Sequence, residues 1–180
     1  MQLIFFLNKL FALILLIVFL PIIIIVCVLI LVFDNQNPVF KQKRLGLSRQ
    51  LFTIYKFQTF KNNQITTLGQ ILRKTGVDEI PQLFNILKDD INFIGPRPLT
   101  QADVNRLGWT SSFYDKRWSV KPGLTGLAQL SPICHKKMTL FWDNYYAKHQ
   151  NFKLNFKILI ATSFILIFGK RKVINYIYNK

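Results

Sequence analysis

An adjacent pair of acids, Asp78 and Glu79, is the feature of this sequence with the clearest capacity for chemistry. The chain of 180 residues has only eight acidic side chains against 24 lysines and arginines, and Glu79 is its one glutamate. An ionised aspartate can attack phosphorus and form an acyl phosphate. A neighbouring carboxylate can hold Mg²⁺, which binds one or two carboxylates together with substrate phosphates. The pair therefore predicts a site for phosphoryl chemistry, with Asp78 and Glu79 as catalytic residues and metal ligands.

Helix capping gives the same two acids a purely structural explanation. Asp78 stands a few residues before apolar side chains that recur at helical spacing from Leu83 to Leu87. Acids at a helix N-terminus cap free N–H groups and complement the helix dipole. We therefore expect a helix that begins near Asp78, with Pro81 in its first turn, where a missing N–H is tolerated. Such a position would also keep Asp78 ionised, so both explanations stay open.

Basic side chains that can bind phosphate accompany the acids. Arg97 lies between Pro96 and Pro98, whose rings fix the backbone on either side of it. A guanidinium held in this way suits bidentate contact with a phosphate group. The alternative for any single basic residue is a solvated surface charge. Further phosphate ligands are expected at three positions: Lys56, Arg73 and Lys121.

Composition points to a protein attached to a membrane. The chain has a net charge of +16, 51% hydrophobic residues and a mean hydropathy of +0.25. This apolar content excludes a disordered chain, and two cysteines in 180 residues exclude a disulfide-rich secreted module. The spacing of the two histidines matches no zinc signature, and the sequence has no P-loop or dinucleotide-type glycine loop. What remains is a compact basic domain, whose charge attracts anionic lipid headgroups.

An uncharged apolar run of 24 residues, Leu10 to Phe33, lies near the N-terminus. As a helix it would reach about 36 Å, which exceeds a bilayer core of about 30 Å. Pro21 divides the run, and proline kinks or breaks a helix. The run is therefore either one spanning helix or two short halves that enter and leave the same leaflet. Lysines and arginines follow it closely, which places the next segment on the cytoplasmic side.

The remaining segments predict a mostly helical α+β domain with a small β-hairpin. β-Favouring residues on either side of a turn predict strand, turn and strand over 38–60. Helices are expected over 67–74, with Thr67 as N-cap and Gly76 as stop, and over 100–107. An apolar stretch near the C-terminus, 158–168, is too short to span a bilayer. With its aromatic and lysine flanks, it makes 152–170 either an interfacial amphipathic helix or a buried core helix.

Four motifs follow one another in an order and spacing typical of one family. They are Pro38 to Gly46, Arg73 to Asn85 around the two acids, Phe93 to Leu99 around the Pro-Arg-Pro loop, and Lys121 to Gln129. Together with the apolar N-terminus that Pro21 divides, the match covers nearly the whole chain, from about Asn8 to Lys170. In these motifs the sequence resembles the bacterial sugar transferase family, specifically its small monotopic phosphoglycosyl transferases.

The resemblance implies a reaction and the residues that perform it. Such enzymes transfer a sugar-1-phosphate from a UDP-sugar to polyprenyl (undecaprenyl) phosphate and release UMP, which is the first membrane step of bacterial glycan assembly. By resemblance, Asp78 is the covalent nucleophile of a ping-pong reaction and Glu79 is associated with Mg²⁺. Arg97 matches the arginine that contacts the nucleotide phosphates. Lys56 and Arg73 match further positions near the active site.

The resemblance also implies how the protein meets its membrane. The family anchor is a re-entrant helix–break–helix, which makes residues 1–36 the anchor, Pro21 its break and residues 37–180 the catalytic domain. The expected location is the bacterial inner membrane, with the active site on the cytoplasmic face. Membrane phospholipid and downstream glycosyltransferases are expected partners besides the two substrates, and nucleic acid is not.

Two other functions remain open beside the transferase. A non-catalytic basic module tethered to the membrane would use the +16 charge to bind anionic lipid or nucleic acid. An inactive family member is the other, because Gln58 stands where the family usually has an arginine.

Overall fold

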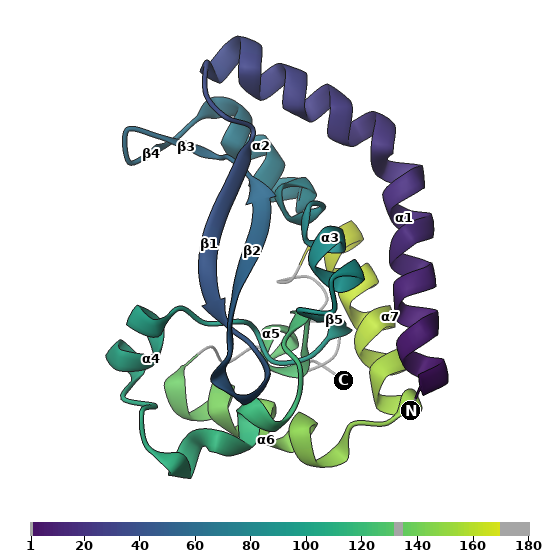
Figure 1. The fold of residues 1–180 in the computed structure, drawn as a ribbon, viewed down its shortest axis with the longest axis vertical. Coiled ribbons are helices and arrows are strands. Elements are labelled where there is room, and N and C mark those ends of the chain that lie inside the picture. The colour runs from purple at the N-terminus through teal and green to yellow at the C-terminus, as the bar shows by residue number, and fades with distance from the viewer. Residues whose placement is uncertain (1, 132–134, 170–180) are drawn as a thin grey trace. The chain divides into compact units, whose positions relative to one another are not determined.

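The computed structural model describes residues 2–131 and 135–169, which form a mostly helical α+β fold (Figure 1). The chain divides into two compact units. The first contains Met1–Lys43 and Thr53–Asp89, and the second contains Arg44–Phe52 and Asp90–Lys180. Within the described ranges the strands pair as β1 with β2, β3 with β4, and β5 with β6. The predicted fold class is thus confirmed at this level.

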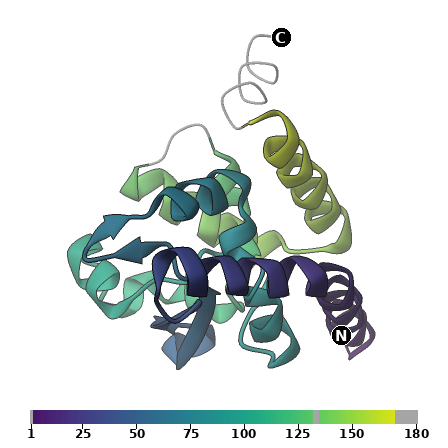
Figure 2. The same cartoon turned by 90° about the horizontal axis from the view of Figure 1, so that it is seen from above.

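The first unit begins with α1 (Gln2–Leu29), which continues into a π-helical turn at Ile30–Asp34. The helix runs through Pro21 without ending, so the predicted break into two separate helices is wrong. Figures 1 and 2 show instead that α1 bends between two straight stretches. Proline commonly causes such a bend, because its ring removes one backbone donor and clashes with the preceding turn. The loss of one hydrogen bond does not end a helix whose other backbone groups remain paired.

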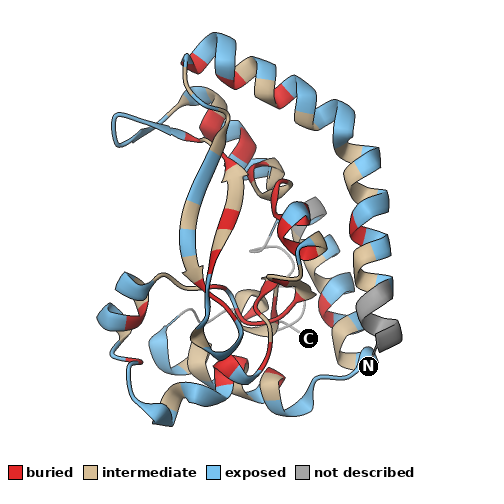
Figure 3. Cartoon of the chain, viewed as in Figure 1, coloured by how far each residue is buried: buried red, intermediate tan, exposed pale blue. Residues whose placement is uncertain are grey.

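Most of α1 carries its apolar side chains on the surface, as Figure 3 shows. Ile17 and Val18, for example, are 63% and 62% exposed. Within the described residues, Leu7–Asp34 is the one helical segment long and apolar enough to cross a membrane. A continuous apolar surface of this kind is typical of contact with lipid or with another protein.

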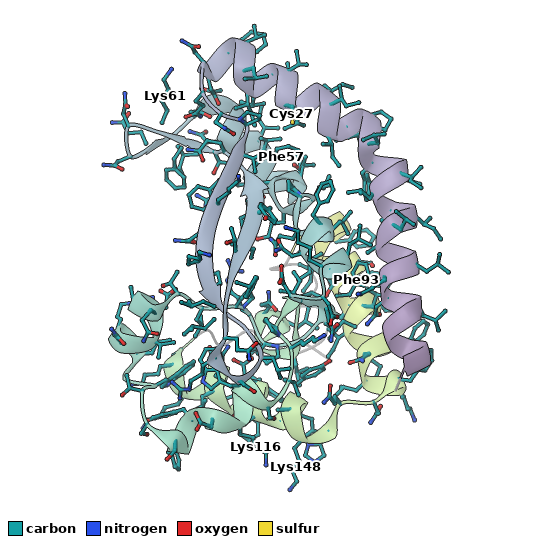
Figure 4. The ribbon with its side chains drawn as sticks, in the orientation of Figure 1. Cys27, Phe57, Lys61, Phe93, Lys116 and Lys148 are labelled. Atoms are coloured by element: carbon teal, nitrogen blue, oxygen red, sulfur yellow. The ribbon has the colours of Figure 1, made fainter. Side chains whose placement is uncertain are left out.

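The C-terminal part of α1 packs against its own unit. Val26 and Ile30 are buried together with Phe57 of β2 (Leu51–Phe57) and Leu72 of α2 (Thr67–Thr75). Figure 4 shows Phe57 close to Cys27, which borders the same cluster. Burial of such side chains contributes about 1.5–3 kcal/mol each. The C-terminal end of α1 is therefore fixed to β2 and α2, α3 (Gln82–Leu87) packs against the helix as well, and most of the other described side chains of α1 are exposed.

Polar contacts of Asp34 fix the point where the apolar helix ends. The carbonyl oxygen of Asp34 accepts a hydrogen bond from Nζ of Lys61 at 2.5 Å, and its carboxylate accepts one from the Thr66 hydroxyl at 2.9 Å. Lys61 belongs to the short antiparallel hairpin of β3 (Phe60–Lys61) and β4 (Gln64–Ile65). The exit of the chain from α1 is thus tied to both the hairpin and the start of α2.

The predicted strand–turn–strand is confirmed. β1 (Val39–Leu45) pairs with β2, and a short 3-10 segment at Leu47–Arg49 makes the turn. Ser48 has a φ of 50° in this turn, a left-handed conformation that few non-glycine residues adopt.

The segment around α2 differs from the prediction at two capping residues. Thr66 rather than Thr67 caps α2, by accepting a hydrogen bond from the N–H of Gly69. Gly76 ends α2 in the left-handed conformation, as predicted. The chain then makes a tight 3-10 turn at Val77–Glu79, and α3 (Gln82–Leu87) begins three residues later. Asp78 therefore caps no helix, because this turn places it well ahead of α3.

A parallel strand pair organises the second unit. β5 (Asn92–Ile94) and β6 (Gly123–Thr125) pair with Asn92 opposite Gly123. Glycine is needed here because the backbones touch: a Cβ on Gly95 would overlap the carbonyl oxygen of Lys121, and one on Gly123 would overlap the backbone at Gly95. The motif that begins at Lys121, with Pro122 and two glycines, therefore contains a strand.

Helices surround this strand pair. Thr100 caps the first of them through a capping box with Asp103, which confirms the helix predicted over 100–107. Buried side chains form one cluster around Trp109 and Trp118 and another around Ile94 and Tyr146. The helical segments are α4 (Gln101–Leu107), a 3-10 helix (Ser112–Ser119), α5 (Leu127–Leu130), α6 (Lys136–His149) and α7 (Phe152–Phe168).

α7 confirms a helix near the C-terminus but not the predicted amphipathic pattern. Ile158 is 2% exposed within the core of the unit, while Phe152, Phe156 and Phe164 are at least half exposed. The buried and the exposed sides of the helix are thus both apolar. Residue 170, the last of the predicted interfacial helix, lies outside the described residues.

Candidate active site

Asp78 and Glu79 occupy the tight turn of the first unit, beside Lys56 of β2. The Nζ atom of Lys56 lies 2.5 Å from a carboxylate oxygen of Glu79. Asp78 is only 7% exposed, whereas the other two side chains are partly exposed. The structure thus brings three of the predicted site residues together around one turn.

The turn is attached directly to the apolar helix. Val77 and Ile80, which flank the two acids, pack against the cluster that contains Val26 and Ile30 of α1. Apolar contact on both sides of the acids orients the turn without using their carboxylates. The position of Asp78 and Glu79 therefore depends on how α1 packs.

Asn85 of α3 fixes the strand that carries Lys56. Its side chain is fully buried, accepts a hydrogen bond from the N–H of Tyr55 at 3.0 Å and donates one to the carbonyl of Thr53 at 2.7 Å. The amide thereby pairs with β2 much as a neighbouring strand would. Because Lys56 follows Tyr55, this contact sets where its ammonium group meets Glu79.

The surroundings of Asp78 raise its pKa. Burial is the largest cause, and the negative charge of Glu79 acts in the same direction. The positive charges of Lys56 and Arg73 lower the pKa, as does a backbone hydrogen bond, but they do not reverse the shift. No α-helix begins at Asp78, so the charged form of its carboxylate is favoured by Lys56, Arg73 and the backbone hydrogen bond instead. A desolvated carboxylate with nearby cations is typical of a functional site.

Arg73 supplies positive charge from the last turn of α2. Its guanidinium carbon lies 4.8 Å from the centre of the Phe60 ring, and its side chain is exposed. Gln58, where the resemblance leads one to expect an arginine, donates a hydrogen bond to the carbonyl of Phe60 at 2.8 Å. Two of the predicted basic ligands, Arg73 and Lys56, therefore act electrostatically on Asp78, while the glutamine makes a local contact.

The two acids suit Mg²⁺ by their donor chemistry. The described residues contain no group of three or more His, Cys, Asp or Glu side chains placed to hold a metal. Two neighbouring carboxylates are nevertheless the protein ligands that Mg²⁺ takes when substrate phosphates and water complete its coordination. Oε1 of Glu79 already lies next to a positive charge, the ammonium group of Lys56. This carboxylate is therefore placed where it attracts cations.

The second unit holds the Pro-Arg-Pro loop. Pro96 and Pro98 are buried, whereas Arg97 between them is exposed. Lys121 belongs to the same unit, and its backbone lies against Gly95. The hollow beside the loop, which Gly46, Pro96 and Arg117 help to line, has no room for a water molecule. Arg97 is therefore suited to meet a ligand at the surface.

Sequence reasoning missed a buried ion pair in this unit. Nη2 of Arg117 lies 2.9 Å from a carboxylate oxygen of Asp143, and the two side chains are 1% and 3% exposed. The partners are 26 residues apart and belong to different helical segments, so no local pattern joins them. The one available signal was the presence of Asp143 in a chain so poor in acids.

Comparison with known proteins now identifies the family. A family model described as Bacterial sugar transferase matches residues 3–169. The uncharacterized sugar transferase EpsL of Bacillus subtilis (strain 168) is 37% identical over 143 residues, which cover 70% of this chain and 68% of EpsL. The chain belongs to the bacterial sugar transferase family.

Two further relatives carry the names of specific reactions. UDP-N-acetylgalactosamine-undecaprenyl-phosphate N-acetylgalactosaminephosphotransferase of Aeromonas hydrophila is 33% identical over 148 residues, 71% of this chain and 34% of the relative. Undecaprenyl-phosphate galactose phosphotransferase of Salmonella typhimurium is 27% identical over 165 residues, 74% of this chain and 34% of the relative. The chain spans about a third of the length of these two proteins.

The raised pKa of Asp78 predicts that Asp78→Asn stabilises the protein at neutral pH. Unfolded aspartate has a pKa of about 3.9, so above that pH the unfolded chain gives up the proton more readily than the folded one. Keeping the carboxylate ionised in the folded protein therefore costs stability, and Asn removes that cost. We expect a higher Tm for Asp78→Asn at pH 7.5, with a gain that shrinks as the pH falls toward about 4.

Thermal unfolding of the detergent-solubilised protein across this pH range measures the effect. Asp115→Asn serves as the control, because the Asp115 side chain is 56% exposed and pairs with Arg49 at the surface. A lower Tm for Asp78→Asn at pH 7.5, or a shift that does not change with pH, would contradict the account of Asp78.

Proposed function

We propose that this protein transfers a sugar-1-phosphate from a UDP-sugar to polyprenyl phosphate, such as undecaprenyl phosphate, and releases UMP. The observation that carries the proposal is the buried Asp78 with a raised pKa, next to the Lys56–Glu79 ion pair, in a chain of the bacterial sugar transferase family. The reactions in the names of the Aeromonas and Salmonella relatives support the substrate classes. The product is a polyprenyl-diphosphate-sugar, the first membrane-linked intermediate of a glycan.

The proposed reaction has two displacement steps at the same phosphorus atom. In the first, a carboxylate oxygen of Asp78 attacks the sugar-bearing phosphorus, the bond to the UMP oxygen breaks, and UMP leaves with that electron pair. In the second, a phosphate oxygen of polyprenyl phosphate attacks the aspartyl phosphosugar. The bond to Asp78 then breaks, so the carboxylate is regenerated and the diphosphate product leaves.

The basic residues and the second acid support this chemistry by charge. Glu79, together with Asp78, would hold Mg²⁺, which neutralises phosphate charge and polarises the bond that breaks. Lys56 holds the Glu79 carboxylate in place, and Arg73 adds positive charge near the nucleophile. On the second unit, Arg97 on its proline-fixed loop is proposed to bind the nucleotide phosphates. Lys121 is proposed to assist it as a second cation.

The membrane arrangement is part of the proposal. Residues 1–36 would form an anchor that enters and leaves one leaflet of the bacterial inner membrane, with the bend of α1 taking the place of the expected break at Pro21. Residues 37–180 would form the catalytic part on the cytoplasmic face, in contact with phospholipid and with downstream glycosyltransferases. The exposed phenylalanines of α7 support contact of 152–170 with the interface. Such an anchor would hold the catalytic acids near the lipid phosphate.

Release of UMP tests the reaction and its nucleophile together. The protein in nanodiscs with Mg²⁺ and polyprenyl phosphate is expected to release UMP from at least one donor in a panel of UDP-sugars. Asp78→Asn should lower the rate at least about 10³-fold, because an amide is a poor nucleophile and a poor leaving group. Asp115→Asn is the matched control and should stay within about twofold. Full activity in Asp78→Asn would contradict the covalent mechanism, and silence across the panel would favour an inactive family member or a lipid-binding module.

The Mg²⁺ response tests the role of Glu79. Glu79→Gln keeps the size of the side chain but removes a charged oxygen ligand, so the Mg²⁺ concentration for half-maximal UMP release should rise about tenfold or more. Titration of Mg²⁺ against the initial rate measures the change, with Asp115→Asn again as the control. An unchanged half-maximal concentration in Glu79→Gln would remove this residue from the metal site.

A further inference from the structure

We propose that Arg117, held by Asp143, is a positioning residue for Arg97: its guanidinium fixes the main chain of the Pro-Arg-Pro loop so that Arg97 meets the nucleotide phosphates of the donor. This inference rests on the proposed function and deepens it, because it concerns how the same donor substrate is recognised. All the contacts that carry it lie within the second unit.

The main chain of the loop is held at both ends by backbone hydrogen bonds. The carbonyl of Pro96 accepts one from the N–H of Gly123 at 3.0 Å. The carbonyl of Leu99 accepts one from the N–H of Leu45 at 2.8 Å. These bonds attach the loop to β6 on one side and to the end of β1 on the other.

The two carbonyls between these ends accept hydrogen bonds from arginine side chains. Nη2 of Arg117 donates to the carbonyl of Arg97 at 3.0 Å, and Nη1 of Arg44 donates to the carbonyl of Pro98 at 3.2 Å. Four consecutive carbonyls are therefore fixed, while the Arg97 side chain itself is exposed. A side chain on a main chain fixed in this way loses less conformational freedom when it binds a ligand.

Arg117 has the rigidity that a positioning role needs. Its Nε and Nη2 atoms donate to the same carboxylate oxygen of Asp143 at 3.0 and 2.9 Å. Its guanidinium carbon lies 4.3 Å from the centre of the Trp118 ring and 5.4 Å from that of Trp109. The planar, charged guanidinium makes an ion pair, two ring contacts and a hydrogen bond to a carbonyl at the same time. The ammonium group of lysine cannot make all four of these contacts.

Arg117 acts through Arg97 rather than on the substrate. It is only 2% exposed, and its hydrogen bonds go to Arg97 and Asp143 of the same unit. A charge this deeply buried is usually paired, and Asp143 supplies the pair. The ion pair with Asp143 therefore stabilises the buried Arg117 guanidinium beside the Pro-Arg-Pro loop. The hydrogen bond to the Arg97 carbonyl lets this guanidinium fix the main chain of the loop.

Arg49 offers a matched control. Its Nε donates to Asp115 at 2.9 Å, its Nη2 donates to the carbonyl of Ser111 at 3.1 Å, and its guanidinium carbon lies 5.3 Å from the centre of the Trp118 ring. It thus makes the same three kinds of contact as Arg117, but it binds a carbonyl outside the Pro-Arg-Pro loop. Arg49→Lys disturbs such a network without touching the loop.

A double-mutant cycle with UDP-sugar tests the proposal. Arg117→Lys should raise the KM for the UDP-sugar about tenfold and change the KM for polyprenyl phosphate by less than about twofold. The control Arg49→Lys should change both KM values by less than about twofold. In an Arg97→Ala background, Arg117→Lys should add less than about twofold to the UDP-sugar KM, because the side chain it positions is already gone. A merely structural role would give equal effects in both backgrounds or on both substrates, and either result would overturn the proposal.

The same cycle measured by equilibrium binding of UDP separates this inference from the proposed function. If the wild type binds UDP and Arg117→Lys weakens binding only while Arg97 is present, the positioning role holds even when no donor in the panel turns over. If the wild type releases UMP but the two substitutions weaken UDP binding independently, the positioning role is wrong and the proposed function stands. Should Arg117→Lys fail to fold, Asp143→Asn takes its place in the cycle, because it keeps the size of the side chain but removes the charge that holds the Arg117 guanidinium.

Discussion

Packing of the end of α1 against β2 and α2 is the contact on which the first unit depends. Val26 and Ile30 bury themselves against Phe57 and Leu72, and the residues that flank the two acids join the same cluster. The C-terminal end of α1, a helix with mostly exposed side chains in its described part, thus packs against the turn that holds Asp78 and Glu79. The proposed membrane anchor would therefore also determine where Asp78 lies, because Val77 and Ile80 pack against the same cluster as the end of α1.

The two units treat their buried charges differently. A protein with a net charge of +16 attracts anions, yet it places one acid where burial and a second acid raise the pKa of that acid. Lys56 and Arg73 reduce the free-energy cost of keeping the buried Asp78 carboxylate ionised, but they do not remove it. The proposed role of Asp78 as nucleophile would therefore cost stability, a trade-off that is common at active sites. In the second unit the buried charges of Arg117 and Asp143 neutralise each other instead.

Local patterns predicted much of the fold, and long-range contacts explain what they missed. The β1–β2 hairpin, the glycine stop of α2 and the helix after Thr100 follow from residue types within a few positions of one another. The site residues Asp78, Glu79 and Lys56 were also predicted, and the structure brings them together. The missed features depend on distant partners: the parallel pairing of β5 with β6, and the buried Arg117–Asp143 pair, whose members no periodicity connects. The predicted helix is present as α3, but its expected start at Asp78 was wrong because a tight turn after Gly76 delays it to Gln82.

The proposed mechanism links Asp78 covalently to the phosphosugar. Mass spectrometry can detect the mass that this link adds to the protein. The protein is incubated with Mg²⁺ and an active UDP-sugar in the absence of polyprenyl phosphate, digested, and analysed by mass spectrometry. The account predicts one added phosphosugar on the peptide that contains Asp78, lost when polyprenyl phosphate is added and absent in Asp78→Asn. UMP release that requires polyprenyl phosphate from the start, with no adduct on this peptide, would contradict the account.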